Sequence, residues 1–369
     1  MHLASDEDQW RLAEQRLRAS MYFAASFTTA IRTLRANEAH NIDRGNDPKE
    51  LSENSRFFLR RLFRAPSILA PLYFLSLTYH EEKLADKSYV SRDYLVSLYK
   101  PGELASILAL IYLYHNLRRV CDPEDWGRYS KIVNDIIEIG GLIGRHLPEL
   151  GFANSLLATG VRHLAAAVFL RTDPANFRIY RRDSKIQQRL LSLEIERRIW
   201  ECTHVEIGTR ILQLFGFGVP FAASFHRAAL TPNRKELDLK SNRLRLTLVW
   251  SEALYLGVKP PVIKGEEQLI ASESILDRIL DEASRIREKG SKHAWLSKRK
   301  NAISPTLTPQ LYKAGEGDAA TANIKATEIK EVDEFLIDFD EMPEQMQSQF
   351  SETQISDLMS EIGDLIEEK

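Results

Sequence analysis

Apolar residues recur every three or four positions along most of the chain, and this spacing is typical of amphipathic α-helices. The first clear run covers residues 6–36 and keeps its apolar positions on one face. Ser5 precedes this run, and its hydroxyl can accept a hydrogen bond from a first-turn amide. The pattern predicts one long helix over 6–36, which stops before the turn-forming residues 45–48.

The same period continues over residues 55–262, where apolar residues are dense and the alternation typical of strands is scarce. This part of the chain predicts helices at 103–119, 128–146, 152–170, 184–200, 203–215, 219–230 and 241–256. Another helix is expected between Gly265 and Arg287. We therefore predict an all-α protein in which these helices form a bundle.

Breaks in the pattern divide the chain into four predicted segments. They are an N-terminal helical extension (1–54), a helical domain (55–262), a helix with a basic connector (263–302) and a tail (303–369). The tail has too little apolar surface to offset its ordering entropy, so we predict that it is disordered. A short amphipathic helix is expected near 351–367, with an apolar stripe suited to a partner's groove, formed by Ile355, Leu358, Met359, Ile362, Leu365 and Ile366.

Charge is divided unevenly along the chain. The 50 Lys and Arg nearly balance the 52 Asp and Glu, for a net charge of −2. From Glu316 to the end, however, the net charge is −13, which leaves +11 on residues 1–315. An acidic tail therefore follows a basic body, and a tethered tail has a high effective concentration near that body.

One basic run surrounds a tryptophan, and it consists of Arg285, Arg287, Lys292, Trp295, Lys298, Arg299 and Lys300. Guanidinium groups that hold phosphate, beside an aromatic ring that stacks on a base, favour nucleic acid or a cyclic dinucleotide. The same run also suits intramolecular docking of the acidic tail. A solvated helix face is a third interpretation, and it is the favoured one for the other basic run, over 171–189.

Composition limits the cellular compartments in which the protein is expected. The 44% hydrophobic content is that of a globular protein. Two cysteines, Cys121 and Cys202, suit a reducing cytosol and exclude a multi-cysteine metal cluster. The first ten residues are acidic, and the longest apolar run, over 104–114, is shorter than the ~20 residues that a membrane span needs. We expect a soluble cytoplasmic protein with no membrane partner.

Motif searches find no recognisable catalytic loop. The chain has neither a P-loop nor a dinucleotide-binding glycine pattern, and it lacks a serine nucleophile elbow. Its nine histidines include no pair spaced i, i+4 and no zinc-protease motif. Gly216 and Gly218 predict a tight turn between two helices. These observations predict no cofactor.

One block resembles the signature of the HDOD domain, the HD-related output domain of bacterial signalling. The matching residues, in order, are Glu196, Thr203, His204, Gly208, Leu212, Phe215 and Gly216. Weaker similarities follow the family's order at 65–75, 156–164 and 173–180. The resemblance implies an HD-type helical bundle that acts as an output or scaffolding module. It also implies signalling proteins as partners, such as response regulators or cyclic-dinucleotide enzymes.

The chain departs from the family's catalytic relatives at the metal positions. HD phosphohydrolases hold metal through a first His, a His-Asp pair and a later Asp. The corresponding positions here are Arg128 or Tyr129, then His163 with Leu164, and Glu252. One neutral His and a displaced Glu do not make a metal site. The sequence therefore predicts no metal, and it predicts that His163 is a packed, hydrogen-bonded core residue.

The sequence favours a non-catalytic signalling or scaffold protein that acts through protein–protein interaction. Self-association through the N-terminal helix is also expected. Two alternatives stay open. One is a residual metal-dependent phosphohydrolase of the HD superfamily. The other is a regulator that binds nucleic acid or a cyclic dinucleotide through the basic run around Trp295.

Overall fold

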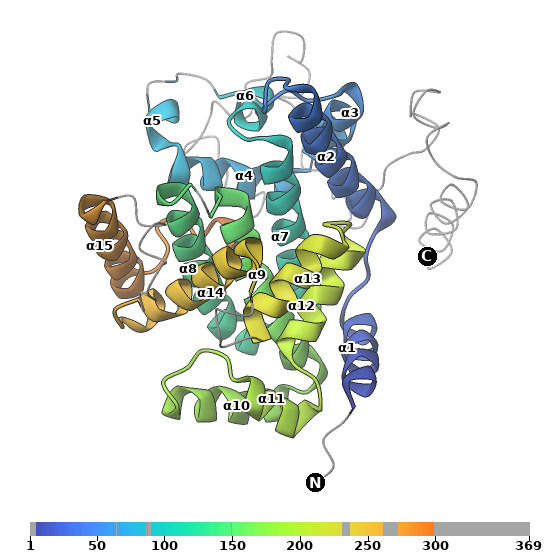
Figure 1. The fold of residues 1–369 in the computed structure, drawn as a ribbon, viewed down its shortest axis with the longest axis vertical. Helices are drawn as coiled ribbons and strands as arrows, with labels where there is room; N and C mark the ends of the chain where they lie inside the picture. Colours follow the sequence, from blue (N-terminus) through green and yellow to red (C-terminus); the bar gives the residue numbers. More distant parts are fainter. Residues whose placement is uncertain are drawn as a thin grey trace. The chain divides into compact units, whose positions relative to one another are not determined.

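The computed structural model describes residues 5–63, 65–85, 87, 90–148, 150–230, 237–260 and 272–298. In these ranges the only regular structure is helical, so the prediction of an all-α fold is confirmed (Figure 1). The elements are α1 (Asp6–Ser20), α2 (Ala25–Arg44), α3 (Glu53–Leu62), α4 (Pro66–Tyr79), α5 (Glu81–Leu84), α6 (Arg92–Ser97), α7 (Pro101–Val120), α8 (Pro123–His146), α9 (Phe152–Thr172), α10 (Pro174–Ile186), α11 (Leu193–Trp200), α12 (His204–Leu214), α13 (Val219–Leu230), α14 (Leu239–Leu256), α15 (Glu273–Lys289) and the 3₁₀ turn η3 (Trp295–Ser297). The predicted tail over 303–369, with its helix at 351–367 and its apolar stripe, lies outside the described residues.

The described residues form two compact units. The first contains the chain up to Tyr22 together with Ala109–Ser297. The second contains Phe23–Leu108, and Lys298 groups with it. The domain limits predicted at residues 54 and 262 do not coincide with these units.

Helix α9 lies at the centre of the first unit, where it packs against α8, α12 and α14 (Figure 1). Its length and apolar composition are those of a membrane span, but 83% of its apolar window is buried inside the protein. In the described part of the chain no other helix meets both criteria. Helix α9 is therefore a core helix of this unit.

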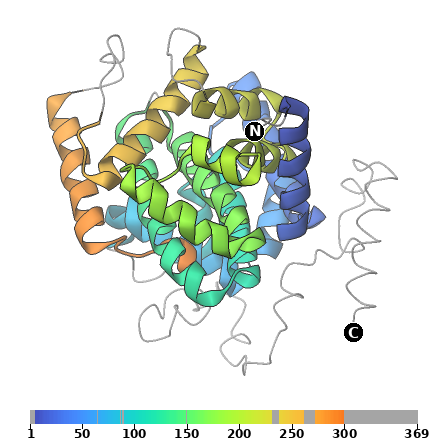
Figure 2. The same cartoon turned by 90° about the horizontal axis from the view of Figure 1, so that it is seen from below.

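The C-terminal part of the first unit packs against α8 and α14. Helix α15 buries Ile279, Ala283 and Ile286 in an apolar cluster with residues of both helices, and Figure 2 shows α15 in orange beside α14. After α15, the Ser291 amide donates to an Asp135 carboxylate oxygen at 2.7 Å. Two carboxylates of α8 thus hold the chain, because the Ser291 hydroxyl also donates to Glu138.

The helix predicted over 6–36 is wrong as a single element. Helix α1 begins as expected, with the Ser5 hydroxyl accepting from the Asp8 amide at 3.2 Å. It ends at Ser20, and Met21 adopts an extended conformation. A tertiary contact stabilises the non-helical backbone at this break, because the Tyr112 hydroxyl donates to the Tyr22 carbonyl at 2.6 Å. No glycine or proline marks this break in the sequence.

The helix predicted over 184–200 is also wrong. Two helices, α10 and α11, flank a non-helical connection in which Gln188 has a left-handed φ of 54°. Side chains from elsewhere in the unit form hydrogen bonds with the backbone of this connection. The Leu190 amide donates to Glu252 Oε1 at 2.8 Å, and the Arg181 guanidinium donates to the Leu190 carbonyl.

In the second unit, α2 fixes the entry to α3. The Asn37 and Asn41 side-chain amides both donate to the Glu50 carbonyl, at 3.1 and 2.8 Å. Asn37 also accepts from the Ser52 amide at 2.7 Å. The Ser52 hydroxyl then caps α3 by accepting from the Ser55 amide at 3.2 Å. These bonds set the position at which α3 begins.

Candidate functional site

Three residues of the HDOD-like block meet where α11 ends and α12 begins. Glu196, Thr203 and His204 are each at most 1% exposed. Thr203 caps α12 in a reciprocal capping box, in which its hydroxyl accepts from the Val205 amide and Glu206 accepts from the Thr203 amide. This cap fixes the first turn of α12, and His204 is the first residue of that turn.

The Glu196 carboxylate is the acceptor at the centre of this junction. It accepts from the His204 amide at 2.8 Å and from His204 Nδ1 at 2.7 Å. The Tyr180 hydroxyl donates to its other oxygen at 2.5 Å. Burial and the negative charge of Glu196 hold the pKa of Tyr180 well above its usual value. Tyr180 therefore stays a neutral donor to the carboxylate.

These partners assign the tautomer of His204. Because the carboxylate accepts from Nδ1, that nitrogen carries the proton, and Nε2 is left as an acceptor. The Arg162 Nε–H donates to His204 Nε2 at 3.4 Å. His204 thus links the Glu196 carboxylate to the Arg162 guanidinium through the two sides of its ring.

Arg162 connects α9 to α12 and, through two contacts, to α14. Besides its bond to His204, its Nη1 donates to the Leu248 carbonyl at 3.4 Å. Its Nη2 lies 3.3 Å from a carboxylate oxygen of Glu252. The two charged side chains are only 13% and 17% exposed. A largely buried ion pair therefore joins α9 to α14, and Glu252 extends it to the Leu190 amide.

His163 is buried beside this network but does not belong to it. Its side chain is in the core, as predicted, but its Nδ1 makes no hydrogen bond within the described residues. Burial and the nearby positive charge of Arg162 hold the pKa of His163 well below its usual value. The imidazole is therefore neutral, and the prediction of a hydrogen-bonded histidine does not hold for Nδ1.

The residues at the HD-type metal positions do not fit a metal ion. Leu164 offers no donor atom, and the Glu252 carboxylate already binds Arg162 and a backbone amide. The Tyr129 hydroxyl donates to the His163 carbonyl at 2.9 Å, while the exposed Arg128 forms an ion pair with Asp125. Within the described ranges, no group of three His, Cys, Asp or Glu side chains is arranged to hold a metal. The local positive charge is a guanidinium, which repels a cation.

Three of the remaining matched residues, Gly208, Phe215 and Gly216, shape the helix packing. A Cβ at Gly208 would lie 3.0 Å from a Phe225 ring carbon and 3.1 Å from a Val161 methyl, so glycine permits a close approach of these helices. Gly216 has a φ of 77°, as expected for the predicted turn. Phe215 is fully buried, with its ring edge-on to Tyr112. These three positions support packing and contact no reactive group.

Neither cysteine is in a reactive setting. Cys121 and Cys202 are both buried. Burial raises the pKa of each thiol to about 12, so both are protonated at neutral pH.

The basic run around Trp295 differs from the expected site. Trp295 is fully buried, so its ring cannot stack on a base. The Arg287 guanidinium bonds the Ser284 hydroxyl at 3.0 Å and covers Gly257. Lys298 lies over the Phe74 ring, 4.7 Å from its centroid. Of the other residues in this run, Arg285 and Lys292 lie near Glu138, whereas Arg299 and Lys300 are outside the described residues.

Sequence reasoning missed Arg162, the residue that completes the network. It is the one charged residue between Phe152 and Leu170, in a helix that is otherwise nearly all apolar or small. Such a charge requires a partner when the helix is buried. This isolation was the available signal, although it could not identify Glu252 as the partner.

Comparisons with known proteins give one informative likeness. No family model matches the chain, and no curated protein matches it. A solved structure of a proposed signal transduction protein from Marinobacter aquaeolei VT8 has a similar fold, with a TM-score of 0.52. The two chains are 13% identical, and the match covers 80% of this chain and 68% of the other. At this identity the likeness concerns the fold alone.

Proposed function

We propose that this protein is a non-catalytic signalling or scaffold component that acts by protein–protein recognition, as an HDOD-like output module of the bacterial cytoplasm. The observation that carries the proposal is the pairing of Arg162 with His204 and Glu252. A side-chain cation stands among the residues where HD-type hydrolases hold their metal. The fold likeness to a proposed signal transduction protein supports the same role.

The chemistry of these residues argues against metal-dependent hydrolysis. Hydrolysis by this superfamily needs a divalent ion that lowers the pKa of a bound water. A guanidinium does not coordinate water, and Arg162 is already occupied by protein acceptors. The surface is then the part of the protein that conveys a signal, with response regulators or cyclic-dinucleotide enzymes as partners. No cofactor is required for this role.

Metal content and phosphodiesterase activity test the non-catalytic part. We expect purified protein to hold far less than one divalent ion per chain, and to hydrolyse bis-p-nitrophenyl phosphate no faster than buffer with added Mn²⁺. Glu252→Gln is the matched variant, because it removes the one acidic group at the supposed metal positions while keeping its size. Stoichiometric metal that is lost in Glu252→Gln, together with metal-dependent hydrolysis, would overturn the proposal.

Capture from the native cell tests the recognition part. The full chain and a 1–302 truncation are used as baits, and each captured protein is then tested as a purified pair. We expect a signalling protein to bind directly. Binding to both baits assigns the contact to the helical units, and binding to the full chain alone assigns it to the acidic tail. Absence of any direct signalling partner would contradict the proposal.

Self-association through the N-terminal helix stays a prediction. Ala13 and Leu17 of α1 are buried, and Trp10 stacks on His226 with the ring centroids 5.1 Å apart. A dimer formed through α1 would therefore use its exposed face or exchange the helix between chains. Light scattering of the Arg11→Glu variant checks the first route, because Arg11 is on that exposed face.

A further inference from the structure

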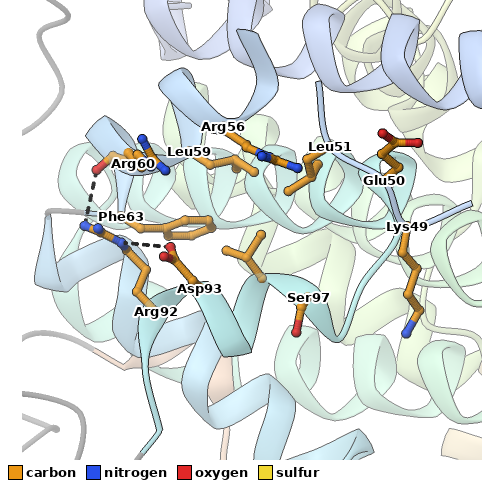
Figure 3. Close-up of a pocket in the computed structure, with 11 residues that line it drawn as sticks. Lys49, Glu50, Leu51, Arg56, Leu59, Arg60, Phe63, Arg92, Asp93 and Ser97 are labelled. Atoms are coloured by element: carbon orange, nitrogen blue, oxygen red, sulfur yellow. Dashed lines mark hydrogen bonds and ion pairs between the residues drawn. The ribbon is translucent and has the colours of Figure 1, made fainter. Parts of the chain in front are cut away.

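A cavity of ≈310 Å³ opens between α3, α6 and the chain at 49–51 in the second unit (Figure 3). Its apolar lining includes Leu51, Leu59, Phe63 and Val96. Small-molecule sites typically measure ~300–1,000 Å³, so this volume suits one small ligand rather than a polymer.

Two arginines on one face of α3 line this cavity. Arg56 and Arg60 are one helical turn apart, so their side chains are neighbours on the helix surface. Both are exposed, and within the described residues neither guanidinium forms an ion pair. Two like charges at this spacing repel each other unless an anion lies between them. The pair therefore favours a phosphate, which accepts bidentate bonds from guanidinium groups.

Arg92 adds a third guanidinium, and this one is tied to the protein. Its Nη1 donates to the Arg60 carbonyl at 3.5 Å, and its Nε lies 3.8 Å from an Asp93 carboxylate oxygen (Figure 3). Asp93 also lines the cavity, and its side chain is 76% exposed. With Glu50, it supplies a carboxylate acceptor in a lining that also holds four cationic side chains, those of Lys49, Arg56, Arg60 and Arg92. A ligand with N–H donors as well as a phosphate matches this arrangement.

We propose that this cavity binds a nucleoside monophosphate or a closely similar organic phosphate. The phosphate lies between Arg56 and Arg60, and the base lies against Leu51, a partly exposed apolar residue of the lining. The Asp93 carboxylate accepts from an amino group of the base. This ligand site goes beyond the signalling role, and it stands or falls independently of it because no residue of the Arg162 network lines the cavity.

Calorimetric titration of the full chain tests the site, with AMP, GMP, adenosine and inorganic phosphate as probes at low salt. We expect AMP or GMP to bind at least about tenfold tighter than inorganic phosphate and than adenosine, because only the nucleotides use both halves of the cavity. Arg56→Ala and Arg60→Ala should each weaken nucleotide binding about tenfold, and the double variant about a hundredfold. The matched control is Arg44→Ala, an exposed arginine of α2 that does not line the cavity.

A second variant separates base recognition from phosphate binding. Asp93→Asn should weaken AMP and GMP several-fold while leaving inorganic phosphate unchanged. Equal effects on all probes would overturn the placement of the base. The site as a whole is overturned if neither nucleotide binds at millimolar concentration, if inorganic phosphate binds as tightly as AMP, or if the Arg56→Ala/Arg60→Ala variant binds as the wild type does. Circular dichroism of each variant verifies that the helices are intact.

Discussion

The two units use arginine in opposite ways. In the first unit, the Arg162 guanidinium is largely buried and has acceptors on His204, Leu248 and Glu252. In the second unit, Arg56 and Arg60 are exposed beside an apolar cavity, and within the described residues they form no ion pair. The same side chain is thus a structural cross-link where its acceptors belong to the protein. It is a ligand-binding group where an acceptor has to be supplied from outside.

Removal of the central acceptor of the first unit should have the largest effect. Glu196→Ala leaves the His204 amide, His204 Nδ1 and the Tyr180 hydroxyl without their acceptor in the core. We expect the free energy of unfolding to fall by about 3–5 kcal/mol. Chemical denaturation measures it, with the exposed Glu194→Ala on the same helix as the control. A loss no larger than that of Glu194→Ala would show that the network is not structural.

Arg162 should be nearly as sensitive. Arg162→Met leaves the largely buried Glu252 carboxylate without its counter-ion, and the expected loss in the free energy of unfolding is about 2–4 kcal/mol. Adding Glu252→Gln removes that charge, so the double variant should recover part of the stability. A double-mutant cycle gives the coupling energy. Additive losses in the two single variants would show that Arg162 and Glu252 are not coupled. Arg171→Met, at an exposed arginine of the same helix, controls for the removal of a charge.

The neutral state of His163 predicts a dependence on pH. Its pKa in the folded protein is well below the ordinary 6.5, so below that pH the unfolded chain binds a proton that the folded chain does not. The contribution of His163 to the free energy of unfolding is therefore fully present above pH 6.5. It falls as the pH drops, by up to about 1.4 kcal/mol per pH unit. Denaturation curves of His163→Leu should show a shallower pH slope than the wild type.

The smallest effect is expected in the second unit. Arg56→Ala/Arg60→Ala removes two exposed groups without ion-pair partners in the described structure, so the unfolding free energy should change by no more than about 0.5 kcal/mol. Leu59→Ala on the same helix empties a buried position and should cost about 2–4 kcal/mol. If the arginine variant were as costly as Leu59→Ala, the arginines would be structural in both units.

Local patterns predicted much of the fold. Helices α7, α8 and α14 lie within a few residues of their predicted limits, because their apolar periodicity and their end signals agree. The turn at Gly216 follows from the same kind of local signal. The two errors have a common cause. The breaks after α1 and after α10 are held by Tyr112 and by Glu252, which are distant in sequence.

The candidate sites were less accessible to sequence reasoning. The HDOD-like block contains Glu196 and His204, which hydrogen-bond to each other at the centre of the buried network. Its essential cation, Arg162, pairs with a residue 90 positions away, and no local pattern encodes that pairing. Arg56 and Arg60 resemble any solvated helix face until the cavity beside them is seen. Trp295 misled for the opposite reason, since its basic neighbours suggested exposure and it is buried.

The anchoring of the chain after α15 determines where the protein can be shortened. Trp295 and Leu296 are fully buried, and the Ser297 carbonyl accepts from Arg118 at 3.2 Å. A chain that stops before residue 291 would therefore leave a cavity in the first unit where the Trp295 ring packs. It would also remove the Ser291 hydrogen bonds to Asp135 and Glu138. A chain that ends at residue 298 keeps Trp295 and Leu296 in the core. Residue 298 is therefore the earliest suitable C-terminus for a protein without the tail.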